Sequence, residues 1–201
     1  MKKSDFYSSL GLLVKKNFLD DELCERIRAE MSSSEGNPAH FIRKDKNLLD
    51  EKVRRTMEKH VSKDTKLLIS DKLSGIKDEL EAYFDLTLSH SQGPKFLYYN
   101  EGDFFQRHYD KGVIPENPQP VKDRKVSTVI FLNSETDKPE NNTCVGGSLI
   151  IYGIMKDPRF KSHGFRLIGT AGMLLAFRSD LLHEVKPVIA GVRYTVVDWF
   201  V

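Results

Sequence analysis

His108 and Asp110 are the residues whose types and spacing first suggest chemistry in this chain. In an extended segment, residues i and i+2 project to the same side. An imidazole nitrogen and a carboxylate oxygen can therefore converge on one point, where a divalent metal ion could bind. The same pair also occurs by chance, since polar loop residues often cap or pair with the backbone. It becomes informative only with a second histidine from elsewhere in the chain.

A second histidine, His183, stands near the C-terminus, where two β-rich runs flank residues 190–191. We predict that these runs form an antiparallel hairpin. Strand residues alternate in direction, so one face of the second run carries Arg193, Thr195, Val197 and Trp199. If this face points inward, a guanidinium lies in the core near His183, where it is costly without a partner. A bound dicarboxylate would supply one, because arginine pairs bidentately with carboxylates.

Two histidines and one carboxylate leave half of the positions of an octahedral iron open, and this facial triad is diagnostic of non-haem Fe(II) oxygenases. Further elements accompany it, in order, over about residues 95–200: Tyr99-x-x-Gly102-x-Phe104-Phe105-x-x-His108-x-Asp110, Thr128-Val129-Ile130-Phe131-Leu132-Asn133, Gly146-Gly147-Ser148-Leu149, and His183 with Arg193 and Trp199. With them the sequence resembles the 2-oxoglutarate/Fe(II) dioxygenases, and within these the prolyl 4-hydroxylase-like branch. The lead-in Asn17-Phe18-Leu19-Asp20-Asp21 is also similar to that of the family.

The resemblance implies a mainly β chain with flanking helices around a double-stranded β-helix (jelly-roll) core. It implies that the metal ligands are His108, Asp110 and His183, and that Arg193 binds the distal carboxylate of 2-oxoglutarate. Tyr99, or else Tyr98, would help to bind this cosubstrate, and Thr195 would add a hydroxyl contact. The implied cofactors are Fe(II), 2-oxoglutarate and O2, with ascorbate as a possible reductant.

Some positions allow a second interpretation or depart from the family. Trp199 would line the substrate pocket near the iron, but it could equally be a core residue, and Tyr99 could be a buried phenol with a partner of its own. Phe131 aligns with a tyrosine that, in the hypoxia-sensing relatives, donates a hydrogen bond to the cosubstrate. The phenylalanine lacks that hydroxyl, so we expect weaker cosubstrate binding or another donor.

The implied reaction couples decarboxylation of 2-oxoglutarate to hydroxylation of an unactivated C–H bond. A prolyl residue of a protein or peptide is the first substrate hypothesis, because the long loop after Asp110 could clamp an extended chain. The alternatives are a free amino acid or other small metabolite, and a non-catalytic binding module that has kept the fold. A deep pocket with an extra charged residue near Trp199 would favour the small molecule.

The elements that must position these residues change in character along the chain. The first 90 residues or so contain a strand at 11–18, a helix opened by Asp20 with buried Leu23, Ile27 and Met31, strands near 40–43 and 52–57, and a helix over 64–84. From residue 95, short apolar runs at 95–100, 104–109, 126–132, 147–153, 165–168, 172–177, 183–188 and 192–200 predict an all-β sandwich or barrel. Long loops are expected at 111–125 and 134–145. We therefore expect one dioxygenase domain over 1–201, with a helical support to about 90 and a jelly-roll core over 91–201.

Composition excludes several classes of protein. The 201 residues suffice for one domain, and no apolar run reaches the roughly 20 residues of a membrane span. Net charge is +2, with 31 basic and 29 acidic residues well mixed, so we expect no nucleic-acid partner and no membrane partner. No signal peptide is recognisable at the N-terminus. Cys24 and Cys144 fit no zinc or redox spacing, so we expect free thiols in a cytoplasmic protein. The oligomeric state is not indicated by the sequence.

Overall fold

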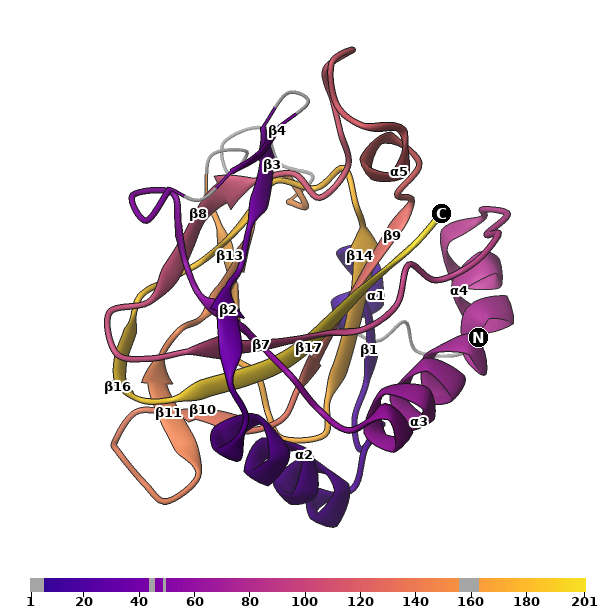
Figure 1. The fold of residues 1–201 in the computed structure, drawn as a ribbon. Helices are drawn as coiled ribbons and strands as arrows, with labels where there is room; N and C mark the ends of the chain where they lie inside the picture. The colour runs from indigo at the N-terminus through magenta and orange to yellow at the C-terminus, as the bar shows by residue number, and fades with distance from the viewer. Residues whose placement is uncertain (1–5, 44–45, 49, 156–162) are drawn as a thin grey trace.

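Two antiparallel sheets face each other in the computed structural model, which describes residues 6–43, 46–48, 50–155 and 163–201 (Figure 1). The larger sheet has seven strands, in the order β1 (Leu13–Lys15), β14 (Leu174–Arg178), β9 (Val126–Phe131), β17 (Arg193–Phe200), β7 (Lys95–Tyr99), β6 (Met57–Lys59) and β2 (Gly36–Pro38). The smaller sheet has five, in the order β13 (Phe165–Leu167), β12 (Leu149–Ile151), β15 (His183–Val185), β8 (Phe104–His108) and β5 (Arg54–Arg55). The expected mainly β, jelly-roll architecture is confirmed.

Two smaller sheets and five helices complete the described chain. One sheet joins β10 (Ser134–Thr136), β11 (Thr143–Gly146) and β16 (Val188–Gly191), and the other joins β3 (Phe41–Arg43) and β4 (Lys46–Leu48). The helices are α1 (Phe6–Ser9), α2 (Asp21–Ser33), α3 (Lys63–Ser74), α4 (Lys77–Phe84) and α5 (Gln119–Lys122). Within the described residues, no helix combines the length and the apolar character needed to cross a membrane.

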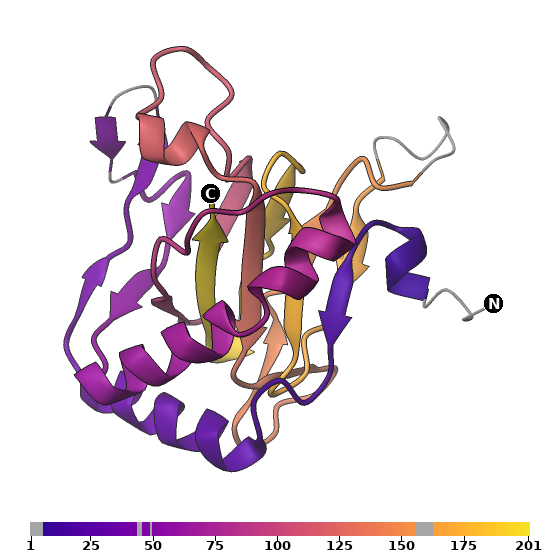
Figure 2. The ribbon, with the colours of Figure 1, turned by 90° about the vertical axis from the view of Figure 1, so that its right-hand side faces the viewer.

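Helices α2, α3 and α4 cover the outer face of the seven-stranded sheet (Figure 2). Helix α2 begins where Asp20 accepts a hydrogen bond from the backbone N–H of Leu23 (2.8 Å), as its sequence predicts. The apolar stripes of the three helices pack on one side of the central strands, in a cluster that includes Ile27, Leu73, Leu80, Ile130 and Val196. This layer anchors the strands that carry the site.

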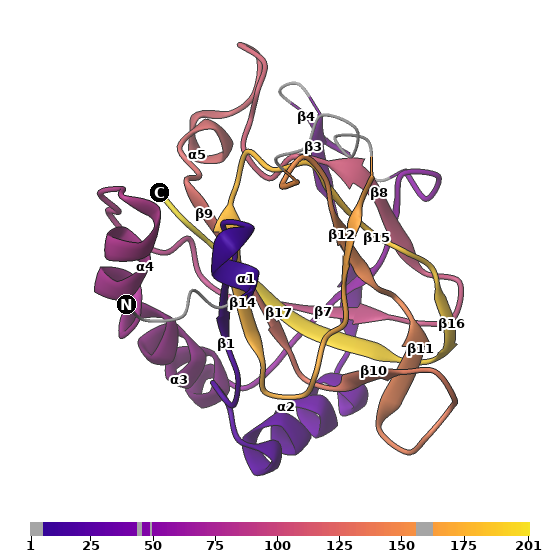
Figure 3. The ribbon, with the colours of Figure 1, turned by 180° about the vertical axis from the view of Figure 1, so that it is seen from behind.

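The other side of the same central strands faces the five-stranded sheet, which Figure 3 shows from behind. Because strand residues alternate, Phe96 and Val196 point to the helices, whereas Leu97 and Tyr99 point between the sheets. A second apolar cluster, which includes Phe105, Phe177 and Val185, fills part of the space between the sheets. The remainder of that space holds polar side chains.

The predicted hairpin around residues 190–191 is wrong. Strand β15 pairs with β8 and β12 in the five-stranded sheet, whereas β17 pairs with β7 and β9 in the seven-stranded sheet. Between them, β16 pairs with β11. At Gly191, whose φ is +74°, the chain thus passes from the three-stranded sheet that contains β16 to the seven-stranded sheet that contains β17. A positive φ favours glycine, so Gly191 correctly indicated a turn in the chain. The turn, however, does not join the two strands of a hairpin.

Three other expectations are corrected in detail. The helix over 64–84 is two helices, interrupted at Gly75 and Ile76, because glycine weakens the helix and the buried Ile76 turns towards the core. The loop 111–125 contains α5, and the loop 134–145 contains β10 and most of β11. Cys24 and Cys144 are both free and buried, as expected.

Candidate metal centre and cosubstrate cavity

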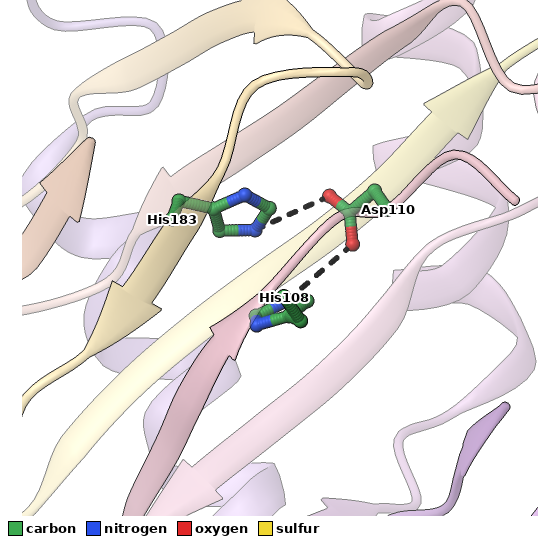
Figure 4. A group of neighbouring side chains, drawn as sticks. All are labelled: His108, Asp110 and His183. Carbon is green, nitrogen blue, oxygen red and sulfur yellow. Dashed lines mark ion pairs between the residues drawn. The ribbon is translucent and has the colours of Figure 1, made fainter. Parts of the chain in front are cut away.

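The five-stranded sheet brings the two histidines together. His108 ends β8 and is the register partner of His183, which begins β15. Asp110 follows β8 after one residue, and its two carboxylate oxygens lie 3.7 Å from His108 Nε2 and 3.5 Å from His183 Nε2 (Figure 4). One ligand atom from each residue lies within 4.8 Å of the others. The predicted triad is therefore assembled in space.

Both imidazoles present the same nitrogen to this point. His108 Nδ1 lies 2.7 Å from the backbone oxygen of Gln106, and His183 Nδ1 lies 2.9 Å from that of Leu181. A carbonyl only accepts, so each Nδ1 donates its hydrogen and each Nε2 keeps a free lone pair. Backbone contacts of this kind commonly fix the tautomer of metal-binding histidines. The donor set of two imidazoles and one carboxylate fits a ferrous ion.

The ionisation of the three residues also suits a metal. Burial, together with the neighbouring His183, lowers the pKa of His108 to about 3. Burial raises the pKa of Asp110, but the two imidazoles and Arg124 outweigh it and lower the pKa to about 2. His108 is thus neutral and Asp110 ionised near neutral pH, which are the protonation states that a metal ion requires.

A cavity of about 280 Å³ opens at the triad and continues between the sheets to Arg193. Arg193 is only 4% exposed. Its guanidinium carbon lies 5.0 Å from the ring centre of Tyr99 and 5.4 Å from that of Phe131. Among the described residues, no carboxylate lies within ion-pair distance of this guanidinium. Such a buried cation fits an anionic ligand.

Glycine 147 makes room for this arginine. Gly147 has a φ of +70°, and a Cβ added there would lie 2.8 Å from Arg193 Cδ. The hydroxyl of Thr195, which is fully buried, accepts a hydrogen bond from Arg193 Nη1 at 3.3 Å. Thr195 therefore helps to fix the orientation of the Arg193 guanidinium. Gly147 and the inward face of β17, which carries Thr195, thus both position the side chain of Arg193.

The two tyrosines of β7 are separated by strand alternation. Tyr99 lines the cavity and is 2% exposed. Tyr98 lies on the helix side, where its ring packs edge-on against Tyr194 at 5.2 Å between centres. Trp199 lines the cavity from the end of β17. Of the two aromatic residues weighed for the cosubstrate, the structure thus brings only Tyr99 to the cavity.

Two arginines of the cavity wall were not singled out from the sequence. Arg124 lies in the segment 111–125, which was expected to be a loop, yet it is half-buried, with its guanidinium 3.8 Å from the centre of the Trp199 ring. It also donates to the backbone oxygen of Asp110 at 3.3 Å. Arg54 lies over the ring of Phe105 at 4.5 Å, and that ring stacks on His108 with centres 3.5 Å apart. Both arginines lie among other charged residues. Such a segment has no alternation of apolar and polar residues from which the inward-facing side chains could be predicted.

Comparison with known proteins agrees with this geometry. The sequence pattern of the 2OG-Fe(II) oxygenase superfamily matches residues 94–201. A prolyl-4-hydroxylase from Pseudomonas putida is 23% identical, with a TM-score of 0.69 and coverage of 94% of this chain and 91% of its own. A Trichoplax adhaerens prolyl hydroxylase in complex with a peptide fragment of the hypoxia inducible factor oxygen degradation domain is 20% identical, with a TM-score of 0.70 and coverage of 96% and 84%.

The viral collagen prolyl hydroxylase of Paramecium Bursaria Chlorella virus-1, in its 2OG complex, is 15% identical, with a TM-score of 0.57 and coverage of 94% of both chains. At these identities the likeness concerns the fold. Comparison with curated protein sequences gives no match. The superfamily pattern, however, spans more than half of the 201 residues and contains the triad and Arg193. The chain belongs to the 2OG-Fe(II) oxygenase superfamily, whose enzymes are dioxygenases that use Fe(II), 2-oxoglutarate and O2.

Proposed function

We propose that this dioxygenase hydroxylates an unactivated C–H bond, with His108, Asp110 and His183 as its iron ligands. The observation that carries the proposal is that the triad and the buried guanidinium of Arg193, which has no carboxylate partner among the described residues, open onto one cavity. A cosubstrate that binds the metal at one end and presents a carboxylate at the other would use both groups. Tyr99 and Thr195 complete the proposed cosubstrate site, the first by facing the cavity and the second by orienting Arg193.

Each part of the chain has a task in this reaction. A ferrous ion held by His108, Asp110 and His183 would supply the oxygen chemistry that couples cosubstrate decarboxylation to C–H hydroxylation. The triad leaves coordination positions open, and the backbone carbonyls behind both histidines hold the imidazoles in place. Arg193 anchors the cosubstrate through a charge-assisted pair. The apolar walls, among them Leu97, Val129 and Val185, exclude water around the reacting groups.

The substrate that we propose is a prolyl residue of a protein or peptide. Three exposed apolar side chains, Tyr109, Val113 and Ile114, lie on the loop that follows β8, and Tyr109 also lines the cavity. The loop and the β3–β4 hairpin lie at the same end of the barrel (Figure 1). An extended peptide could cross this end and place a prolyl ring near Trp199. The structural neighbour from Trichoplax adhaerens is itself a peptide complex.

A free amino acid or small metabolite is the second candidate substrate. The observation that favours it is the guanidinium of Arg124 on the ring of Trp199 at 3.8 Å, a charged group beside the substrate pocket. The modest cavity volume of about 280 Å³ also suits a molecule of this size.

Succinate formation with Fe(II), 2-oxoglutarate and ascorbate tests the proposal against a panel of proline peptides and free amino acids. We expect one class to stimulate turnover, and Asp110→Ala to abolish it. Stimulation by a proline peptide, with hydroxyproline in the product, supports the first candidate. A protein with its triad intact that binds neither metal nor cosubstrate would instead be a non-catalytic module.

We also propose that residues 1–201 act as one dioxygenase domain. Strands β1, β2, β5 and β6, all from the first 60 residues, complete the two large sheets. The N-terminal part thus contributes strands to the core in addition to the helical support. Arg54, on the cavity wall, comes from this part as well.

A further inference from the structure

The cavity carries more positive charge than its own residues neutralise. The guanidiniums on its wall belong to Arg54, Arg124 and Arg193. The carboxylates on its wall are Asp110 and Glu58, and Glu58 is already paired with Lys95 at 3.1 Å. A ferrous ion and a 2-oxoglutarate dianion would cancel each other's charge. A loaded cavity would therefore keep a net positive charge.

Arg54, like Arg193, lacks an acidic partner among the described residues, but no cosubstrate carboxylate is assigned to it. Its Nη1 donates to the backbone oxygen of His40 at 2.7 Å, while its Nε is buried and, within the part of the chain that the structure describes, has no hydrogen-bond partner. Among the described residues no carboxylate lies within ion-pair distance of it. A buried donor left unpaired is rare and costly in folded proteins.

Strand register explains why this arginine points inward. Arg54 is the cross-strand partner of Phe105, whereas Arg55 is the partner of Phe104. Neighbouring residues of a strand face opposite sides. Arg55 accordingly pairs with Asp103 at 3.0 Å, away from the cavity, and Arg54 lies on the ring that stacks against His108. The guanidinium of Arg54 is thus separated from His108 by the ring of Phe105.

Arg124 adds a second cation, with part of its charge already balanced. Its Nε donates to Gln92 at 2.8 Å and its Nη1 donates to the backbone oxygen of Asp110. The carboxylates that act on it electrostatically are those of Asp110 and Asp198, and Arg54 repels it. Two mutually repelling guanidiniums beside one metal site are stabilised by an anion that reaches both.

We propose that the substrate carries a carboxylate close to the carbon that is hydroxylated, and that Arg54 binds this carboxylate with Arg124 as the second cation. The inference rests on the proposed function and narrows its substrate class. The carboxylate has two possible sources, an aspartate or glutamate side chain near the target residue of a peptide, or the α-carboxylate of a free amino acid or chain end. Both offer the planar acceptor that a guanidinium binds.

The test is a binding measurement on the full chain loaded with Mn(II) and 2-oxoglutarate, since Mn(II) occupies such sites without turnover. The ligands are matched pairs: proline peptides with Glu or Gln, or Asp or Asn, next to the proline; peptides with a free or amidated C-terminal proline; and L-proline against prolinamide. We expect the acid of at least one pair to bind about ten- to a hundredfold more tightly than its amide. The pair that shows the preference identifies the source of the carboxylate.

The same titrations on Arg54→Gln locate the effect. We expect the preference for the acid to fall to about twofold or less, while binding of Mn(II) and 2-oxoglutarate stays unchanged and shows that the variant is folded. Arg178→Gln is the matched control, because Arg178 is a solvent-exposed arginine that pairs with Asp180. It should keep the preference in full.

Two results overturn the inference. One is that no acid binds better than its amide, including the case in which no ligand of the panel binds; the other is a preference that survives Arg54→Gln. In both cases Mn(II) and 2-oxoglutarate still bind, and the proposed function stands. If these two fail to bind to the unaltered chain, the proposed function itself is wrong.

Discussion

The two faces of β17 differ in what they contribute to the molecule. Towards the helices the strand presents Val196 and Phe200, both about 1% exposed and packed in the apolar cluster under α2, α3 and α4. Towards the five-stranded sheet it presents Arg193 and Trp199, which line the cavity. The first face holds the strand in place by packing. The second presents polar and aromatic groups to the cavity, and one of them, Arg193, has no carboxylate partner among the described residues.

This difference shows how one strand can serve stability and chemistry together. Burial of an unpaired cation opposes folding, whereas burial of apolar side chains favours it. The helix layer offsets the cost of the polar cavity. Changes on the cavity side should therefore alter binding and turnover with little loss of stability, and changes on the helix side should do the reverse.

Changes in the triad should give the largest difference between the effect on turnover and the effect on stability. Asp110→Ala should reduce turnover by at least about a thousandfold, because it removes the anionic metal ligand. The Tm of the metal-free protein should change by only about 2–4 °C, which corresponds to about 1 kcal/mol. Succinate assays and thermal melts measure both. The wild type should gain about 2.7 kcal/mol at a metal concentration a hundredfold above Kd, and Asp110→Ala should gain almost nothing.

The helix side should behave in the opposite way. Leu73 is fully buried between α3 and the sheet, so Leu73→Ala should lower the free energy of unfolding by about 2–5 kcal/mol. At low temperature, where the variant is still folded, kcat should stay within about twofold of the wild type. Leu67→Ala is the matched control, since Leu67 lies on the same helix and is 51% exposed. A strong loss of kcat with unchanged stability would contradict the division between the two faces.

The cosubstrate anchor should show as a KM effect. Arg193→Met should raise the KM for 2-oxoglutarate about ten- to a hundredfold, because a charge-assisted pair is lost. Gly147→Ala should raise it several-fold, since the new Cβ would meet Arg193 Cδ at 2.8 Å. Gly153→Ala provides the control: its φ of +77° imposes the same backbone strain, but its Cβ would meet nothing within 4 Å. Equal KM values for the two alanine variants would exclude the steric explanation.

The smallest effect concerns pH. In the metal-free protein the pKa of His108 is lowered to about 3, while the unfolded chain takes up this proton near pH 6.5. The unfolded state therefore binds more protons between these values, and stability falls as the pH is lowered through 6.5 towards 3. Between pH 7.5 and 5 we expect His108 to contribute a loss of about 1–2 kcal/mol. Urea unfolding should show a smaller loss for His108→Gln; an identical loss would assign the effect to other groups.

The sequence was sufficient for the fold class, and it singled out three residues that the structure brings together. Alternation predicted that Arg193 and Trp199 share a face, and short apolar runs from residue 95 predicted the strands of the jelly roll. Both patterns depend on neighbours along the chain. The spacing of His108 and Asp110 belongs to the same class of local signal, and only the meeting with His183 required the fold.

The errors arose where the partner of a segment lies far away in the sequence. The sequence around Gly191 predicts a hairpin, but β15 and β17 pair with other strands, in two separate sheets. From the sequence, Arg124 looks like a solvent-exposed loop residue. No neighbouring residue indicates that it contacts the ring of Trp199, 75 positions later. Arg54 lies in a charged stretch whose direction is set by pairing with β8. Contacts between segments far apart in the sequence decide these three cases: strand pairing for Gly191 and Arg54, and the ring of Trp199 for Arg124.

Calorimetric titration of the metal-free chain, first with Mn(II) and then with 2-oxoglutarate, tests the central claim most directly. We expect one metal ion per chain, cosubstrate binding only after the metal, and loss of both in Asp110→Ala. In Arg193→Met we expect metal binding to be kept and 2-oxoglutarate to bind about ten- to a hundredfold more weakly. Cosubstrate binding that needs neither the metal nor Arg193, or metal binding that survives removal of Asp110 and both histidines, would contradict the account.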